Sequence, residues 1–146
     1  MQYKMKNLSE INACEQHALS LCKENLSKQT EQWHLNSPRK VSACLYIPTR
    51  NEYVVSQNIG ISKVTGSLCA ERAAVATAVS KYPDLKMEEL TDLFIVGTSN
   101  PLLPCGVCCE WLHQINPYMH LYAIKEDCLV KVSLKDYYGD ESFLER

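Results

Sequence analysis

The sequence predicts an α/β protein, a three-layer αβα sandwich built around a mixed sheet of about five strands. The expected elements follow one another in the order helix, two strands, helix, strand, helix, two strands. Only residues 125–127 separate the last two strands, whereas a parallel crossover needs about a dozen residues. If these two strands are adjacent, they are therefore antiparallel. A length of 146 residues suits a single domain, residues 1–146.

The first half of the chain predicts one helix and a hairpin. Apolar side chains recur at steps of three and four over residues 7–27, which is the spacing of an amphipathic helix. An apolar run over residues 41–47 ends at Pro48 and predicts a strand. Residues 53–57 return as its hairpin partner. The following residues, 59–68, have two glycines and little periodicity, so they predict a loop.

The second half of the chain predicts two helices and three strands. Residues 69–82 are rich in Ala, Glu and Arg, which favour a helix. The run Leu-Phe-Ile-Val within residues 92–98 indicates a buried strand, and a Pro-rich loop leads from it to a third helix over residues 105–115. Residues 119–124 and 128–134 supply the last two strands.

Charge and composition favour an intracellular protein that does not bind nucleic acid. The formal net charge is -2, from 15 basic and 17 acidic residues, and no basic stripe of the kind found in nucleic-acid binders is present. No apolar run reaches the roughly 18 residues of a membrane span. Residues 1–9 lack the apolar stretch of a signal peptide, so we expect a cytoplasmic location. The eight cysteines are then expected to be reduced.

Two of the expected helices open with cysteine. Cys69 starts the run Cys-Ala-Glu-Arg, and Cys105 and Cys108 belong to the run Pro-Cys-Gly-Val-Cys. A helix start favours thiolates through the helix dipole and its free N–H groups. Three thiolates on zinc leave the fourth tetrahedral position open, which is the pattern of catalytic zinc. The alternative is a structural zinc with Cys109 as fourth ligand, although Cys108 and Cys109 are adjacent and should point apart on a helix.

With these motifs the chain resembles the cytidine deaminase family, because zinc deaminases carry a ligand-x-Glu followed by Pro-Cys-x-x-Cys. It is most similar to the small tetrameric type with three cysteine ligands, and the resemblance extends loosely over nearly the whole chain. The resemblance implies the αβα fold and a Zn²⁺ cofactor on Cys69, Cys105 and Cys108. It also implies a small cytosine-containing substrate and a homo-oligomer, either a tetramer or a dimer.

The resemblance also implies roles for four further residues. Glu71 is similar to the proton carrier of the family, which takes a proton from the attacking water and delivers protons to the ring and to the leaving amine. Arg72 is similar to the arginine that hydrogen-bonds the zinc thiolates, and Asn58 and Ala70 are similar to substrate-binding residues. Alternatives stay open for three of them: Glu71 as a helix N-terminal carboxylate, Arg72 as an exposed helix arginine and Asn58 as a loop-capping amide.

Three positions depart from the family pattern. Gly60, two residues after Asn58, stands where the family has a ribose-binding glutamate. Arg39 and Lys40 occupy the place of an aromatic wall. Cys109 occupies the place of an arginine. These changes leave the chemistry intact and bear on the substrate.

The substrate therefore has two main candidates. Cytidine or deoxycytidine is the first expectation. The alternative is a modified cytosine compound, either a nucleoside antibiotic or a nucleotide, because blasticidin-type deaminases also lack the ribose glutamate. An anionic group that meets Arg39 or Lys40 would favour this alternative. A nucleic-acid editor is disfavoured by the acidic balance and the antiparallel final strands, and an inactive zinc-binding homologue by the intact Cys-Ala-Glu.

Overall fold

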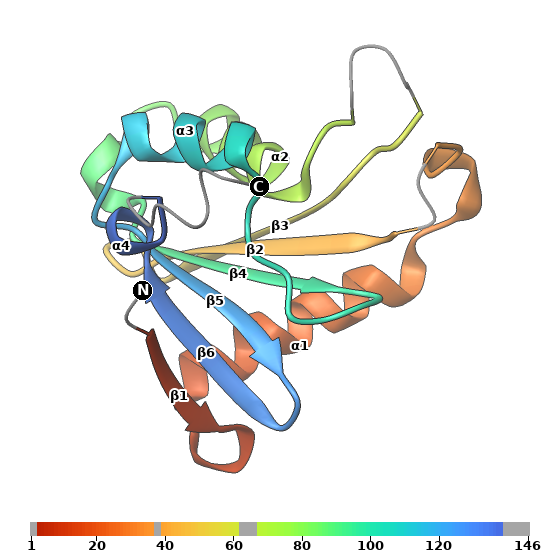
Figure 1. Cartoon of the computed structure of the whole chain (residues 1–146). Helices are drawn as coiled ribbons and strands as arrows, with labels where there is room; N and C mark the ends of the chain where they lie inside the picture. Colours follow the sequence, from red (N-terminus) through yellow and green to blue (C-terminus); the bar gives the residue numbers. More distant parts are fainter. Residues whose placement is uncertain (1–2, 37–38, 62–66, 139–146) are drawn as a thin grey trace.

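A mixed six-stranded sheet forms the middle layer of the molecule (Figure 1). The structure, a computed structural model, describes residues 3–36, 39–61 and 67–138. The strands in chain order are β1 (Tyr3–Asn7), β2 (Val41–Ile47), β3 (Glu52–Gln57), β4 (Asp92–Gly97), β5 (His120–Lys125) and β6 (Cys128–Ser133). They lie in the order β1-β6-β5-β4-β2-β3, with β4 and β5 parallel and every other neighbouring pair antiparallel. The predicted fold class and the antiparallel final pair are confirmed.

The sheet has six strands rather than about five because β1 adds to its edge. β1 pairs antiparallel with β6, from Tyr3 opposite Val132 to Asn7 opposite Cys128. All five residues of β1 are exposed. Backbone hydrogen bonds to β6 therefore hold this strand, and its sequence shows no buried face that would have predicted it.

Three helices cover the two faces of the sheet (Figure 1). Helix α1 (Ala13–Lys28) lies on one face, and helices α2 (Ala70–Lys81) and α3 (Gly106–Ile115) lie on the other. A short fourth helix, α4 (Leu134–Tyr138), follows β6 directly and was not predicted. None of the helices in the described residues is both long enough and apolar enough to cross a bilayer.

Capping determines where α1 begins. The Asn12 side chain accepts a hydrogen bond from the Glu15 N–H at 2.8 Å, and the Glu15 carboxylate accepts one from the Asn12 N–H at 3.0 Å. This capping box starts the helix at Ala13 rather than at residue 7. The preceding residues form a short 3₁₀ turn, η1 (Leu8–Glu10), and two similar turns occur later as η2 (Glu31–Trp33) and η3 (Met87–Glu89).

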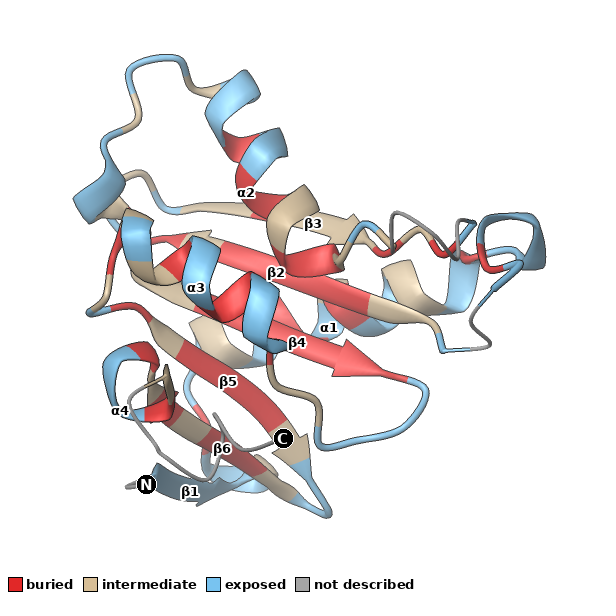
Figure 2. Cartoon of the chain, turned by 45° about the horizontal axis from the view of Figure 1, so that its top comes forward, coloured by how far each residue is buried: buried red, intermediate tan, exposed pale blue. Residues whose placement is uncertain are grey.

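Buried residues lie along the strands of the sheet and on the helices that cover it, and Figure 2 shows them in red. Successive residues of β2 point to opposite faces, and this alternation divides the core. Leu45 packs in one cluster with Ala74 of α2 and Leu112 of α3. Cys44 packs in the other cluster with Cys22 of α1. The starts of α2 and α3 are thereby held over the same face of the sheet.

Candidate metal centre and substrate cavity

Three cysteine sulfurs meet at the starts of α2 and α3. Cys69 is the N-cap residue of α2, Cys105 is the N-cap residue of α3, and Cys108 lies in the first turn of α3. Neither cap residue makes a side-chain capping hydrogen bond, so both thiols point to other partners. The three Sγ atoms lie within 4.8 Å of one another. The structure thus brings together all three predicted metal ligands.

The chemistry of this cluster fits a zinc ion. A Zn–S bond of about 2.3 Å separates the sulfurs of a tetrahedral site by about 3.8 Å, and the three sulfurs, all within 4.8 Å of one another, lie near enough to share one ion. Cys108 is buried, Cys69 is half-buried and Cys105 is exposed. The centre therefore has a closed inner side and an accessible outer side, as a site with one open coordination position requires.

The surroundings of the cluster favour a thiolate at Cys69. The pKa of Cys69 is lowered to about 5, first because the Cys108 thiol donates to its sulfur and then because Arg72 lies against it. The pKa of Cys108 is raised because its thiol is the donor in that bond. Arg72 also contacts Cys108, and its guanidinium donates to the Ser67 carbonyl at 3.3 Å. Arg72 is thus anchored beside the sulfurs and not on the open surface of α2.

Glu71 is a buried carboxylate next to the cluster. It lies in the first turn of α2 and is 6% exposed. Burial raises its pKa to about 7, and the charge of the neighbouring Cys69 adds to this effect. A carboxyl group with such a pKa both accepts and releases protons near neutrality.

A cavity of about 180 Å³ opens beside these groups. It contains one carboxylate, two of the three metal-ligand candidates and a wall of aliphatic side chains, a combination that suits a flat ring with one reactive polar edge. Its lining residues are Arg39, Val41, Asn58, Ser67, Leu68, Cys69, Ala70, Glu71, Ile95, Leu102, Leu103 and Cys105. The predicted substrate residues Asn58 and Ala70 both belong to this lining.

The Asn58 side chain caps the backbone at the start of β2. Its side-chain oxygen accepts a hydrogen bond from the Val41 N–H at 2.8 Å, and its side-chain nitrogen donates to the Arg39 carbonyl at 3.0 Å. It is 8% exposed. The capping alternative is therefore present in the structure, while contact with substrate stays a prediction.

Of the positions that depart from the family pattern, some line the cavity and others do not. Gly60 is not among the residues that line the cavity. Its N–H donates to the Trp33 carbonyl and its carbonyl accepts from the Asn36 N–H, both at 2.7 Å. Lys40 forms an ion pair with Glu31 and also lies outside the cavity lining. Arg39 lies within it.

Cys109 is fully buried and stands apart from the three clustered sulfurs. Its thiol donates to the Pro104 carbonyl at 3.4 Å, and burial raises its pKa to about 12. Because its sulfur lies outside that cluster, the geometry does not favour the four-cysteine alternative.

A glycine lies against the aliphatic wall. Gly97 ends β4, and a Cβ atom there would lie 2.1 Å from Cδ1 of Leu102. The Leu102 side chain thus occupies the space next to Gly97, and Leu102 and Leu103 both line the cavity. Neither leucine was predicted. The signal for them is an apolar pair inside a loop, between Pro101 and Pro104.

Fold and site together define a deaminase domain with a zinc-binding region. Residues 12–124 match the family described as "Cytidine and deoxycytidylate deaminase zinc-binding region". This match covers more than half of the 146 residues, and the chain belongs to that family.

Solved structures of cytidine deaminases share the fold. The enzyme from Burkholderia pseudomallei superposes with a TM-score of 0.71 at 22% identity, covering 89% of this chain and 98% of that chain. The enzyme from Bacillus anthracis gives 0.62 at 20% identity, covering 90% and 93%. The enzyme from Mycobacterium leprae gives 0.62 at 14% identity, covering 84% and 98%. None of the curated proteins compared with the chain matches it.

Proposed function

We propose that the protein is a zinc-dependent deaminase that converts cytidine or deoxycytidine to uridine or deoxyuridine and releases ammonia. The observation that carries the proposal is the placement of three clustered sulfurs and the buried carboxylate of Glu71 around one cavity. Family membership and the fold shared with cytidine deaminases support it.

In this proposal Cys69, Cys105 and Cys108 hold the zinc. Bound zinc supplies the acidity that makes water a nucleophile near neutral pH. Three thiolates on Zn²⁺ leave a net charge of about -1, which would oppose that acidity. Arg72, which touches Cys69 and Cys108, offsets part of this charge.

Glu71 moves the protons. Its carboxylate takes one proton from the water that attacks the amino-bearing carbon, and it delivers that proton to the adjacent ring nitrogen as the C–O bond forms. It then takes the second proton from the new hydroxyl group and delivers it to the amine, so that the carbonyl forms, the C–N bond breaks and ammonia leaves. The raised pKa of Glu71, about 7, suits both halves of this cycle.

The test of this function is a Glu71→Gln variant. We expect it to keep the zinc of the unmodified protein and to lose about 10²–10⁴-fold in turnover, as loss of a proton carrier does. Glu24→Gln, on the exposed side of α1, is the matched control and should retain both. Metal content and ammonia release are the measurements. Full activity in Glu71→Gln would remove this residue from the reaction, and a zinc-free active protein would refute the proposal.

One observation favours the second candidate, a cytosine compound that bears an anionic group. Arg39 lines the cavity, and Lys40, which is paired with Glu31, lies outside the lining. Gly60 offers no carboxylate to a sugar and bonds instead to Trp33. An arginine at the cavity matches a phosphate or a carboxylate better than an uncharged ribose.

A substrate panel distinguishes the two candidates. Cytosine, cytidine, deoxycytidine, their monophosphates and blasticidin S are compared by ammonia release. If the substrate is a free nucleoside, cytidine or deoxycytidine has the highest kcat/KM and Arg39→Gln leaves it unchanged. If the substrate is anionic, a charged compound leads the panel, and Arg39→Gln lowers its kcat/KM while the matched Lys40→Gln does not.

Assembly into a homo-oligomer, a tetramer or a dimer, is also part of the proposal. An exposed apolar groove over α3 supports it, with Met87 61%, Val107 63% and Trp111 39% exposed. Light scattering on the purified protein gives the mass, and a monomer at working concentration would contradict this part.

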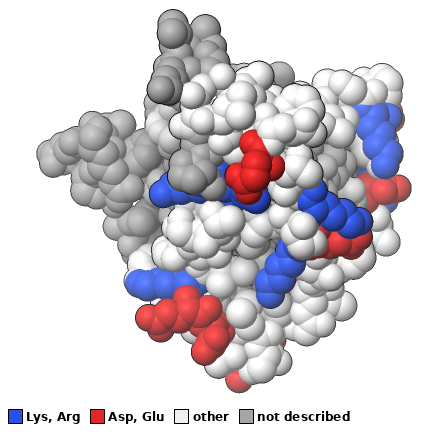
Figure 3. All heavy atoms as spheres, turned by 90° about the vertical axis from the view of Figure 1, so that its right-hand side faces the viewer, with Lys and Arg blue, Asp and Glu red and all other residues white. Residues whose placement is uncertain are grey.

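Nucleic acid is not the proposed substrate. On the described part of the face in Figure 3, basic and acidic side chains lie intermixed among uncharged atoms, with no continuous basic stripe. The formal net charge of -2 agrees with this distribution.

A further inference from the structure

Cys105 differs from the other two ligand candidates in how it is held. Cys108 is buried and Cys69 is half-buried, so the packing of their own side chains restricts them. Cys105 is exposed. The position of its sulfur therefore depends on the backbone at the junction between the loop after β4 and helix α3.

One carbonyl at this junction accepts two side-chain hydrogen bonds. The carbonyl oxygen of Pro104 accepts from the Cys109 thiol at 3.4 Å and from the Tyr137 hydroxyl at 3.1 Å. Cys109 is fully buried and Tyr137 is 4% exposed. Cys109 also donates its backbone N–H to the Cys105 carbonyl at 2.8 Å. Both peptide groups that flank Cys105 are thus restrained.

This arrangement constrains the ligand because a peptide group is planar. The Pro104 carbonyl belongs to the same plane as the nitrogen and Cα of Cys105. Two donors on that oxygen fix the orientation of the plane, and with it the direction in which the Cys105 side chain leaves the backbone. Tyr137 comes from α4, which packs against α3 (Figure 1). In this contact the ring centroids of Tyr138 and His113 lie 4.8 Å apart.

We propose that Tyr137 is a positioning residue for the metal centre, acting together with Cys109 through the Pro104 carbonyl to aim the Cys105 sulfur at the other two. This inference rests on the proposed zinc site. It assigns a function in metal binding to α4, an element that contributes no ligand and does not line the cavity.

If the Tyr137 hydroxyl had a purely structural role, its loss would lower stability and leave zinc affinity unchanged. A buried carbonyl needs a donor in any fold, and losing one lowers the free energy of unfolding wherever it occurs. The matched control is Tyr122, which is also 4% exposed and donates its hydroxyl to Asp92 at 2.7 Å, in the cluster on the α1 side of the sheet. Tyr122→Phe should lower stability without changing zinc affinity.

The experiment compares zinc affinity, by competition with a chromophoric chelator, in the full-length unmodified protein, Tyr137→Phe and Tyr122→Phe. We expect Tyr137→Phe to weaken zinc binding about tenfold, the loss typical of partners behind a metal ligand. We also expect it to change the visible absorption of the cobalt-substituted protein. Unchanged zinc affinity and an unchanged cobalt spectrum in Tyr137→Phe would overturn the proposal.

Cys109, the second donor to the Pro104 carbonyl, allows an independent test of the proposal. Cys109→Ser keeps a donor and should retain zinc affinity, whereas Cys109→Ala removes the donor and should weaken binding. Equal affinities in these two variants would contradict the proposal even if Tyr137→Phe failed to fold. If the unmodified protein bound no zinc, the proposed function itself would be refuted, which is a separate outcome.

Discussion

Asn58 directly follows β3 and lines the cavity. Its side chain also forms hydrogen bonds with the backbone at the start of β2. Both of its amide groups are already bonded, to the Val41 N–H and to the Arg39 carbonyl. Contact with a sugar hydroxyl would have to share or replace one of these bonds. At this position, capping and substrate binding make different predictions.

Asn58→Ala should reduce the free energy of unfolding by about 1–3 kcal/mol, because it leaves two backbone groups near the cavity without their partner. Urea denaturation measures this loss. Asn58→Asp is the comparison variant, because it keeps the acceptor for Val41 and loses the donor to Arg39. A variant with unchanged stability and a raised KM would instead identify Asn58 as a substrate ligand.

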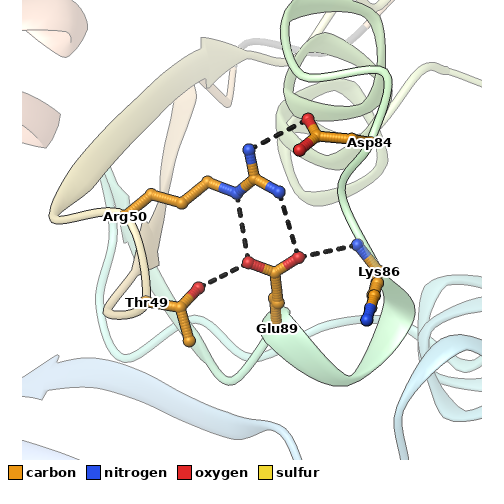
Figure 4. A network of polar contacts seen from close by, with 5 residues as sticks. All are labelled: Thr49, Arg50, Asp84, Lys86 and Glu89. Carbon is orange, nitrogen blue, oxygen red and sulfur yellow. Dashed lines mark hydrogen bonds and ion pairs between the residues drawn. The ribbon is translucent and has the colours of Figure 1, made fainter.

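At the scale of elements, an ion-pair network ties the β2–β3 turn to the segment that follows α2 (Figure 4). The Arg50 guanidinium donates to both carboxylate oxygens of Glu89, at 3.1 and 3.2 Å, and to Asp84 at 3.0 Å. Glu89 also accepts from the Thr49 hydroxyl and from the Lys86 N–H at 2.8 Å. The Glu89 carboxylate thus joins these two segments.

This network predicts how stability depends on acid. The pKa of Glu89 is lowered to about 2, first by Arg50 and then by Thr49 and the Lys86 N–H. In the range between about 2 and its ordinary 4.5, the unfolded chain therefore binds more protons than the folded protein. The stability from this group is present above pH 4.5 and is lost as the pH falls towards 2.

Glu89→Gln should therefore lower the Tm at neutral pH and reduce the further fall of Tm between pH 4.5 and 2. Thermal unfolding followed by circular dichroism over this range measures the effect. Glu88→Gln, at the exposed neighbouring position, should follow the unmodified protein. An identical acid profile for Glu89→Gln and the unmodified protein would contradict the role given to the network.

Elements with an apolar run, an apolar period or a helix-favouring composition were predictable from the sequence, and those without such a pattern were not. The strand over residues 41–47 was predicted with the bounds that the structure has, because its buried run ends at a proline. β1 was missed because it is exposed along its whole length. α4 was missed because five residues are too few to display a helical period.

At the scale of the whole molecule, the three clustered sulfurs lie where the chain has left the sheet after two different strands. β4 ends at Gly97 and its following loop leads to Cys105, while the chain after β3 leads to Cys69. Ligand sites of α/β folds lie beyond the carboxyl ends of strands in this way.

The candidate ligands themselves were predictable because their spacing along the chain is a motif. The contacts that hold these ligands in place were not predictable, because they join residues that are distant in the sequence. Tyr137 and Pro104, which are joined by a hydrogen bond, are 33 positions apart. No local pattern of residue types contains that information.

Zinc removal should destabilise the folded protein as a whole. The ligands come from two helix starts that only the folded chain brings together, so zinc binds the folded state and stabilises it by about 2.7 kcal/mol at a free concentration of 100 Kd. Thermal unfolding with and without excess chelator measures the difference. Cys128→Ser, away from the cluster, should keep the full response, whereas Cys69→Ser should lose most of it. An unmodified protein with the same Tm in zinc and in chelator would mean that the three sulfurs do not share a metal.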